Sequence, residues 1–89
     1  MDDLRAALGQ RVRELRERQR ISQQQLAERA DLDTTYISGI ERGRRNPGLN
    51  TLARLARALR VSFPVLVTDL RPHVKAKVRR GRPPKRQES

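Results

Sequence analysis

The chain has 89 residues, of which 21 are Lys or Arg and 10 are Asp or Glu, giving a formal net charge of +11 at pH 7. This length predicts one small domain. The absence of cysteine excludes disulfides, and a single histidine, His73, argues against a metal site, a cofactor or an enzyme. No apolar run approaches the ~20 residues of a membrane span, so we expect a cytoplasmic protein with no membrane partner, and we expect no small-molecule ligand.

Two helices are predicted in the first third of the chain. The first, over roughly 3–18, rests on four apolar residues at helical spacing: Leu4, Leu8, Val12 and Leu15. Ser22 is a good N-cap for the second, over 23–30.

A third helix follows so closely that the second and third must cross steeply. Asp31 occupies the turn, Asp33 caps a helix over about 34–41, and Gly43 is placed to end it in a left-handed conformation. Helices that cross within so short a segment come into near backbone contact, which the small side chain of Ala27 permits. Such a unit places the exposed face of its second helix into a groove. In a chain this basic, we expect the major groove of DNA.

Two further helices complete the predicted domain. Asn46-Pro47-Gly48 is a turn signal. The fourth helix is predicted from apolar and small residues at helical spacing: Leu49, Leu52, Ala53, Leu55, Ala56 and Leu59. Ser62 and Pro64 open a short fifth helix that runs through about Leu70. The expected fold class is therefore all-α, a five-helix domain over residues 1–70.

The fifth helix carries more apolar residues than one core needs. Three residues around it are expected to close the core: Val61, Phe63 and Leu66. The other three, Val65, Val67 and Leu70, are expected to contribute to a two-fold dimer interface.

Residues 71–89 form a separate basic tail, which we expect to be disordered on its own. They carry five Arg, three Lys and one Glu, a net charge of +7, whereas residues 1–70 carry +4. Within the tail, Arg80-Gly81-Arg82-Pro83 is similar to the core of the AT-hook. Gly lets an extended backbone lie flat in a narrow minor groove, and the two arginines then point along the A·T floor. The alternative is a generic basic tail that neutralises phosphates.

The central part of the chain resembles a known family. It reads SQQQLAERADLDTTYISGIERGRRNP, followed by LNTLARLARALRVSFPVL. Over about residues 8–68 it resembles the phage Cro/repressor-type (XRE) helix-turn-helix family, and particularly small stand-alone members such as the controller proteins of restriction–modification operons. Separate features carry the resemblance: Ser22-Gln23, Leu26-Ala27, the pair Ile37 and Ile40, and Glu41-Arg42-Gly43.

The resemblance implies a domain that binds double-stranded operator DNA as a homodimer, with its third helix in the major groove. The residues that would bind DNA are Gln23, Asp33, Thr34, Thr35, Tyr36, Ser38, Gly39, Arg42, Arg44, Arg45 and Asn46. Gln23 would contact a phosphate, residues of the third helix would face base edges, and the arginines after it would follow the backbone. Arg16 on the first helix would pair with Glu41.

This sequence departs from the family pattern at two places. Asp31 stands where Gly is usual in the turn, and Asp tolerates positive φ better than most residues. Thr34 stands where Arg or Gln is common, and Gly39 has no side chain, so direct readout by long bidentate side chains would be sparse. Specificity would then depend on thymine methyl contacts, on Arg45 and on DNA shape.

Simpler interpretations stand beside these assignments. Tyr36 could be a packing residue, the arginines after the third helix could form a solvated loop, and Arg16 and Glu41 could be two surface charges. The leading function is a DNA-binding transcriptional regulator. The alternatives are an antitoxin-type protein that neutralises a toxin and represses its own operon, and a nucleoid-associated or RNA-binding basic protein with little sequence preference.

Overall fold

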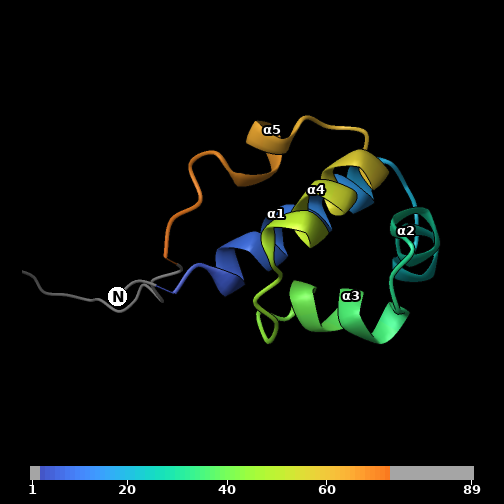
Figure 1. Ribbon diagram of the computed structural model, residues 1–89, viewed down its shortest axis with the longest axis horizontal. Helices are drawn as coiled ribbons and strands as arrows, with labels where there is room; N and C mark the ends of the chain where they lie inside the picture. Colours follow the sequence, from blue (N-terminus) through green and yellow to red (C-terminus); the bar gives the residue numbers. More distant parts are fainter. Residues whose placement is uncertain (1–2, 73–89) are drawn as a thin grey trace, which may run out of the picture.

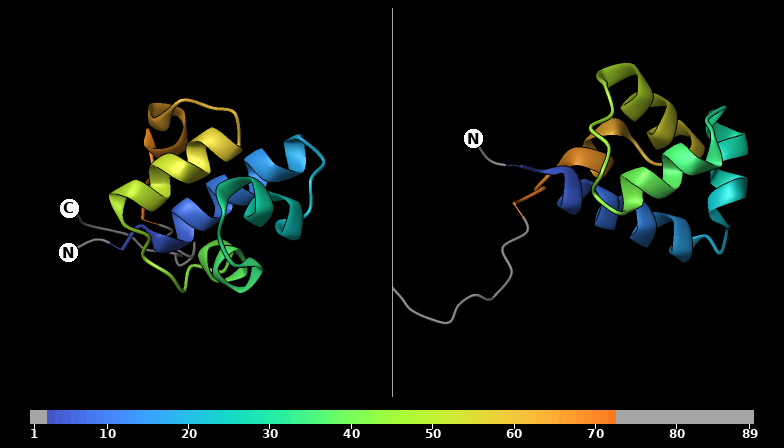
Figure 2. Two further views of the ribbon diagram at one scale, coloured as in Figure 1. Left: turned by 45° about the vertical axis from the view of Figure 1, so that its right-hand side comes forward. Right: turned by 90° about the horizontal axis from the view of Figure 1, so that it is seen from below.

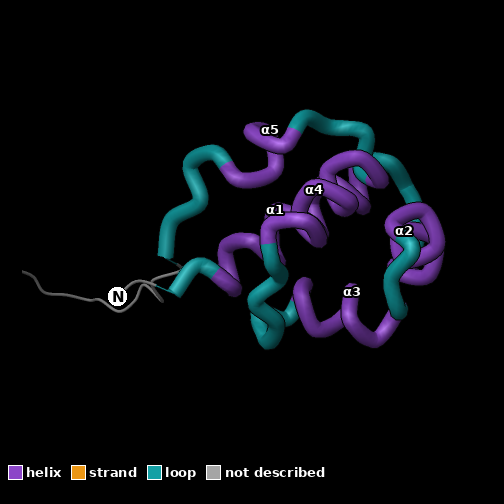
Figure 3. Tube along the Cα trace, viewed as in Figure 1, coloured by secondary structure: helices purple, strands orange, loops and turns teal. Residues whose placement is uncertain are grey.

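A computed structural model describes residues 3–72 of the chain. Within them lie five helices and no strand: α1 (Arg5–Arg18), α2 (Gln23–Ala30), α3 (Thr34–Glu41), α4 (Leu49–Ala58) and α5 (Phe63–Val67). The predicted all-α fold is confirmed. α3 and α5 lie on opposite sides of the molecule with α1 and α4 between them, and α2 stands at one end (Figures 1 and 2). Figure 3 distinguishes these helices from the loops that connect them.

One apolar core joins all five helices. Its fully buried large side chains are Val12, Leu26, Ile37, Ile40, Leu55, Leu59 and Leu66. Burial of each such side chain contributes roughly 1.5–3 kcal/mol relative to its exposure. The core therefore holds α3 by Ile37 and Ile40, and the opposite side of this helix faces outward.

The ends of α2 and α3 follow the predicted capping residues. Ser22 and Gln25 form a reciprocal capping box at the start of α2, which satisfies two backbone donors. Asp31 adopts a left-handed conformation, φ 56°, at the end of α2, and Gly43 adopts φ 74° after α3. The turn between the two helices is thus made by an aspartate that accepts positive φ.

Gly9 allows the close crossing of α1 over α3. A methyl group at Gly9 would meet the carbonyl oxygen of Ile40 and lie 2.7 Å from that of Glu41. No Cβ fits there, so the backbones approach directly. Ala27 is also buried on α2, which packs on α3 and α4. Gly9, however, is the position where a helix crossing most strictly requires a small side chain.

The first helix begins later, and the fifth ends earlier, than the pattern predicted. Leu4 is the N-cap residue and is 42% exposed, and Asp3 before it accepts the backbone N–H of Arg5 at 3.0 Å. α5 ends at Val67 because Thr68 is extended and Asp69 is left-handed, φ 60°.

Burial of α4 and α5 is also more selective than predicted. Only the second half of α4 is buried, so Leu49 at its first residue is 71% exposed and Ala53 is exposed too. Leu66 closes the core, whereas Val61 and Phe63 are only partly buried. No helix formed by residues 3–72 combines the length and apolar character needed to cross a membrane.

Candidate nucleic-acid interface

The outward side of α3 carries the predicted reading residues. Thr34 and Thr35 are exposed, and Tyr36 and Ser38 are partly buried, while the intervening Ile37 faces the core. Seen from below, α3 crosses the lower face of the domain with no other helix in front of it (Figure 2, right). This helix therefore presents small hydroxyl side chains on its outward side, and Tyr36 beside them is partly buried against the core.

Asp33 has a structural role at the start of α3. Its carboxylate accepts the backbone N–H of Thr35 at 2.9 Å and so caps the positive end of the helix. A role of Asp33 in DNA binding stays a prediction.

Arg45 lies over the surface of α3 that Gly39 leaves open. Its guanidinium carbon is 5.4 Å from the centroid of the Tyr36 ring, within cation–π range. A methyl group at Gly39 would come 2.8 Å from Cγ of Arg45. Gly39 itself is buried, although we had expected it to face a base edge. The long side chain missing from this position of α3 is thus supplied by the following loop.

The loop after α3 is held in place by its own backbone. Gly43 donates to the carbonyl of Ile40 at 3.0 Å, and Arg44 donates to that of Gly39 at 2.8 Å. Four exposed residues follow at this end of α3: Arg42, Arg44, Arg45 and Asn46. None of these arginines makes an ion pair with a carboxylate of residues 3–72. Their charge is therefore free to face an anion.

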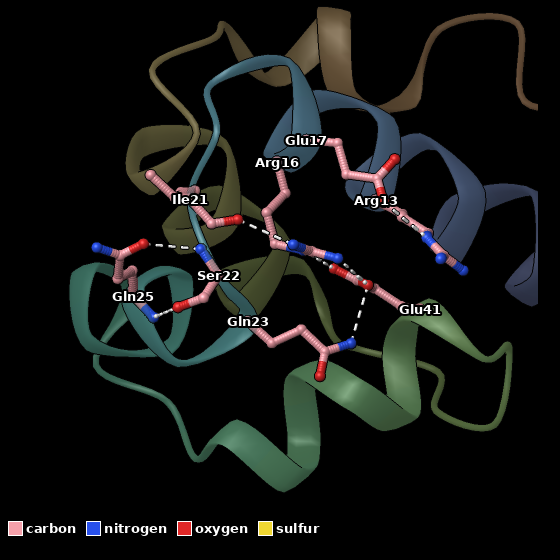
Figure 4. Close-up of polar contacts among 8 residues, drawn as sticks. All are labelled: Arg13, Arg16, Glu17, Ile21, Ser22, Gln23, Gln25 and Glu41. Carbon is pink, nitrogen blue, oxygen red and sulfur yellow. Dashed lines mark hydrogen bonds and ion pairs between the residues drawn. The ribbon is translucent and has the colours of Figure 1, made fainter.

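Glu41 joins three elements through a buried carboxylate (Figure 4). Arg16 on α1 donates to its two oxygens at 2.7 and 3.1 Å, and Gln23 on α2 donates at 3.0 Å. The third donor group of Arg16 reaches the carbonyl of Ile21 at 2.9 Å. Only 13% of the Arg16 side chain and 3% of the Glu41 side chain are exposed.

This pair also suits the position of Glu41 in its helix. Glu41 is the last residue of α3, where a negative charge opposes the helix dipole. Arg16 offsets that charge, and the same hydrogen bonds raise the pKa of its guanidinium above the usual value. The arrangement fixes α3 against α1 and α2. Gln23, predicted to contact a phosphate, has its amide nitrogen on this carboxylate.

The tail residues predicted to bind DNA, Arg80, Gly81, Arg82 and Pro83, lie outside the described residues. The last described residues do show where the tail begins. Leu70 lines one groove together with Asn46 and Pro47, and with Leu4 and Leu52. The tail therefore leaves the domain beside the loop that follows α3.

Sequence reasoning missed two features of this site. Gly9 interrupts a helical pattern, and an isolated glycine there often has a packing reason, so this signal was present. The placement of Arg45 over Gly39 had no such signal, because it depends on the path of a loop.

The chain matches the family model described as helix-turn-helix, HTH_3, over residues 12–66. The control protein C.SmaI of Serratia marcescens is 46% identical over 66 residues, which are 74% of this chain and 79% of that protein. The immunity repressor protein of Bacillus phage phi105 is 42% identical over 62 residues, which are 70% of this chain and 43% of the repressor. The chain thus matches less than half the length of this second relative.

Solved structures of controller proteins have the same fold. The restriction-modification controller protein C.AhdI from Aeromonas hydrophila shares 43% sequence identity at a TM-score of 0.70, covering 73% of this chain and 97% of that one. The controller protein C.Esp1396I, solved as a tetramer in complex with its natural 35 base-pair operator, shares 33% identity at a TM-score of 0.68. That match covers 74% of this chain and 87% of the other.

Proposed function

This chain belongs to the helix-turn-helix family HTH_3, and we propose that it is a sequence-specific DNA-binding transcriptional regulator that binds operator DNA as a homodimer. One observation carries the proposal. α3 is buried on one side by Ile37 and Ile40 and open on the other, and the three arginines at its C-terminal end make no ion pair within residues 3–72. An exposed helix of this size next to free positive charge fits the major groove of DNA.

The reading face would work mostly through small groups. The hydroxyls of Thr35 and Ser38 can donate to or accept from base edges, and the methyl groups of Thr34 and Thr35 suit thymine methyls. Arg45 is a long cationic side chain that already lies on this face, over Gly39 and beside Tyr36. We therefore assign it to the groove and not to the phosphates.

The remaining polar groups would hold the phosphates. Arg42 and Arg44 are exposed, and neither makes an ion pair with a carboxylate among residues 3–72. Gln23 has a second amide hydrogen besides the one given to Glu41, and this hydrogen remains for a phosphate oxygen. Glu41 thus orients Gln23 at the start of α2.

The homodimer would form through α5 and the residues after it. Val65 is 48% exposed, while Val67 and Leu70 are partly buried against the core and line a groove together with Asn46 and Pro47. A two-fold axis there would place the two recognition helices about 34 Å apart, one turn of DNA. A relative assembled as a tetramer on its operator supports an oligomeric regulator.

The basic tail would extend the contact along the DNA. It begins beside Asn46, at the recognition side of the domain, and carries a net charge of +7. Arg80, Gly81, Arg82 and Pro83 would enter a narrow minor groove next to the half-site. Such a protein acts in the cytoplasm, at the nucleoid.

Selection of bound DNA from a random pool by the full-length chain tests the proposal. We expect an enriched motif with two-fold symmetry and half-sites one helical turn apart. Recovery of sequences without a shared motif would instead identify a basic protein that binds DNA through its charge alone.

A further inference from the structure

α5 is too short to hold its own conformation. It has five residues, well below the length at which an isolated helix is stable in water. Its first turn is fixed by Ser62, whose hydroxyl accepts the backbone N–H of Val65 at 3.3 Å, and its middle by Leu66 in the core. The carbonyl groups at its C-terminal end need another partner.

Arg11 of α1 supplies that partner from across the domain. One guanidinium nitrogen donates to the carbonyls of Val65 at 2.7 Å and Leu66 at 3.3 Å, and another donates to the carbonyl of Thr68 at 3.0 Å. The planar fork of an arginine spans three acceptors in fixed geometry, which a lysine cannot do. Its charge also faces the negative end of the helix.

All three hydrogen bonds of Arg11 end on one short stretch of backbone. That stretch carries Val65 and Val67, two of the apolar side chains assigned to the dimer surface. The guanidinium of Arg11 reaches α5, which lies on the opposite side of the domain from α3 (Figures 1 and 2), so it is turned away from the proposed DNA face. A phosphate contact would not account for its position.

Resting on the proposed homodimer, we propose that Arg11 is a positioning residue for dimerisation, which holds the backbone of α5 so that Val65, Val67 and Leu70 form one surface. Without Arg11, Leu66 keeps α5 attached to the core, but the C-terminal half of α5 loses its fixed path. The helix-turn-helix unit, whose own contacts involve Arg16, Glu41 and Gly9, stays folded.

Arg11→Gln tests this assignment, with Arg13→Gln as the matched control. Arg13 lies on the same helix, is exposed and, within residues 3–72, forms an ion pair with Glu17 alone, so both changes remove one charge. Sedimentation of the full-length chains should show a dimer dissociation constant at least about tenfold larger for Arg11→Gln, and an unchanged one for Arg13→Gln. Arg11→Lys should recover only part of the loss.

Amide hydrogen exchange separates positioning from general stability. The amides of Leu66 and Thr68, which donate to Ser62 and Pro64, should exchange faster in Arg11→Gln. The amide of Ile37 in α3 should keep its rate. Unaltered dimerisation, or equal acceleration at Ile37, would overturn the inference. A wild-type chain that is monomeric at high micromolar concentration would overturn the homodimer itself, and this inference with it.

Discussion

Removal of the Glu41 carboxylate is the perturbation whose cost follows most directly from the structure. In Glu41→Ala, the guanidinium of Arg16 keeps its hydrogen bond to Ile21 but loses both bonds to a carboxylate. With 13% of its side chain exposed, Arg16 cannot be fully rehydrated in place. Stranding one member of a buried ion pair costs up to about 5 kcal/mol, and partial exposure lowers this to roughly 2–4 kcal/mol.

That loss is large for a domain of this size. For a free energy of unfolding of about 5 kcal/mol, Glu41→Ala removes roughly 40–80% of it. Each kcal/mol shifts the melting temperature of so small a domain by about 4–8 °C, so thermal denaturation followed by circular dichroism should show a decrease of at least about 8 °C. Urea denaturation gives the free energy independently.

Glu17→Ala is the matched control for Glu41→Ala. Glu17 pairs with Arg13 at 3.2 Å, but both side chains are more than half exposed, so its loss should cost less than about 1 kcal/mol. The double change Arg16→Met with Glu41→Leu should recover much of the stability, since no charge is then stranded. If Glu41→Ala melts like the wild type, or no differently from Glu17→Ala, the pair does not stabilise the fold and the reasoning fails.

Three further predictions concern the crossing of α1 over α3, the reading face and the tail. Gly9→Ala should lower the free energy of unfolding by about 1–3 kcal/mol in a urea titration, because its methyl group would meet backbone carbonyls. Gly48→Ala, with open space around it, should be nearly neutral in the same titration. Gly39→Ala should leave the melting temperature almost unchanged but displace the flexible Arg45 side chain, so selected DNA motifs should change; an unchanged motif would contradict the role given to Arg45. Deletion of residues 71–89 should keep the operator preference. It should reduce the slope of log affinity against log salt concentration by several units, at about 0.9 per lost phosphate contact. Arg82→Lys should weaken binding more to operators with A·T-rich flanks than to those with G·C-rich flanks, and equal loss on both would leave only charge neutralisation.

Local features of the fold could be predicted from the sequence because each is decided within a few residues. Ser22 and Asp33 cap the helices that they precede, and Asp31 and Gly43 adopt the left-handed conformations expected of them. Each of these outcomes depends on the chemistry of one side chain and its nearest backbone.

Features set by tertiary geometry could not be predicted in the same way. The hydrogen bonds from Arg11 to the end of α5 span more than fifty residues of sequence, and those from Arg54 to Ala30 and Asp31 span more than twenty. In the sequence, nothing distinguishes these arginines from solvent-exposed arginines on a helix. The exposure of Leu49 had no signal either, because its spacing fits the apolar face of α4 while the buried part of that helix begins later.

The central claim, that α3 reads DNA sequence while Arg42 and Arg44 hold the DNA backbone, is tested most directly by a specificity ratio. The affinity of the full-length chain for its selected operator is divided by its affinity for random DNA at one salt concentration. Thr35→Ala and Ser38→Ala should lower this ratio. Arg44→Ala should weaken binding to both DNAs alike and reduce the salt slope by about one unit. A ratio that falls for Arg44→Ala and stays constant for Thr35→Ala and Ser38→Ala would contradict the assignment of α3 as the reading helix.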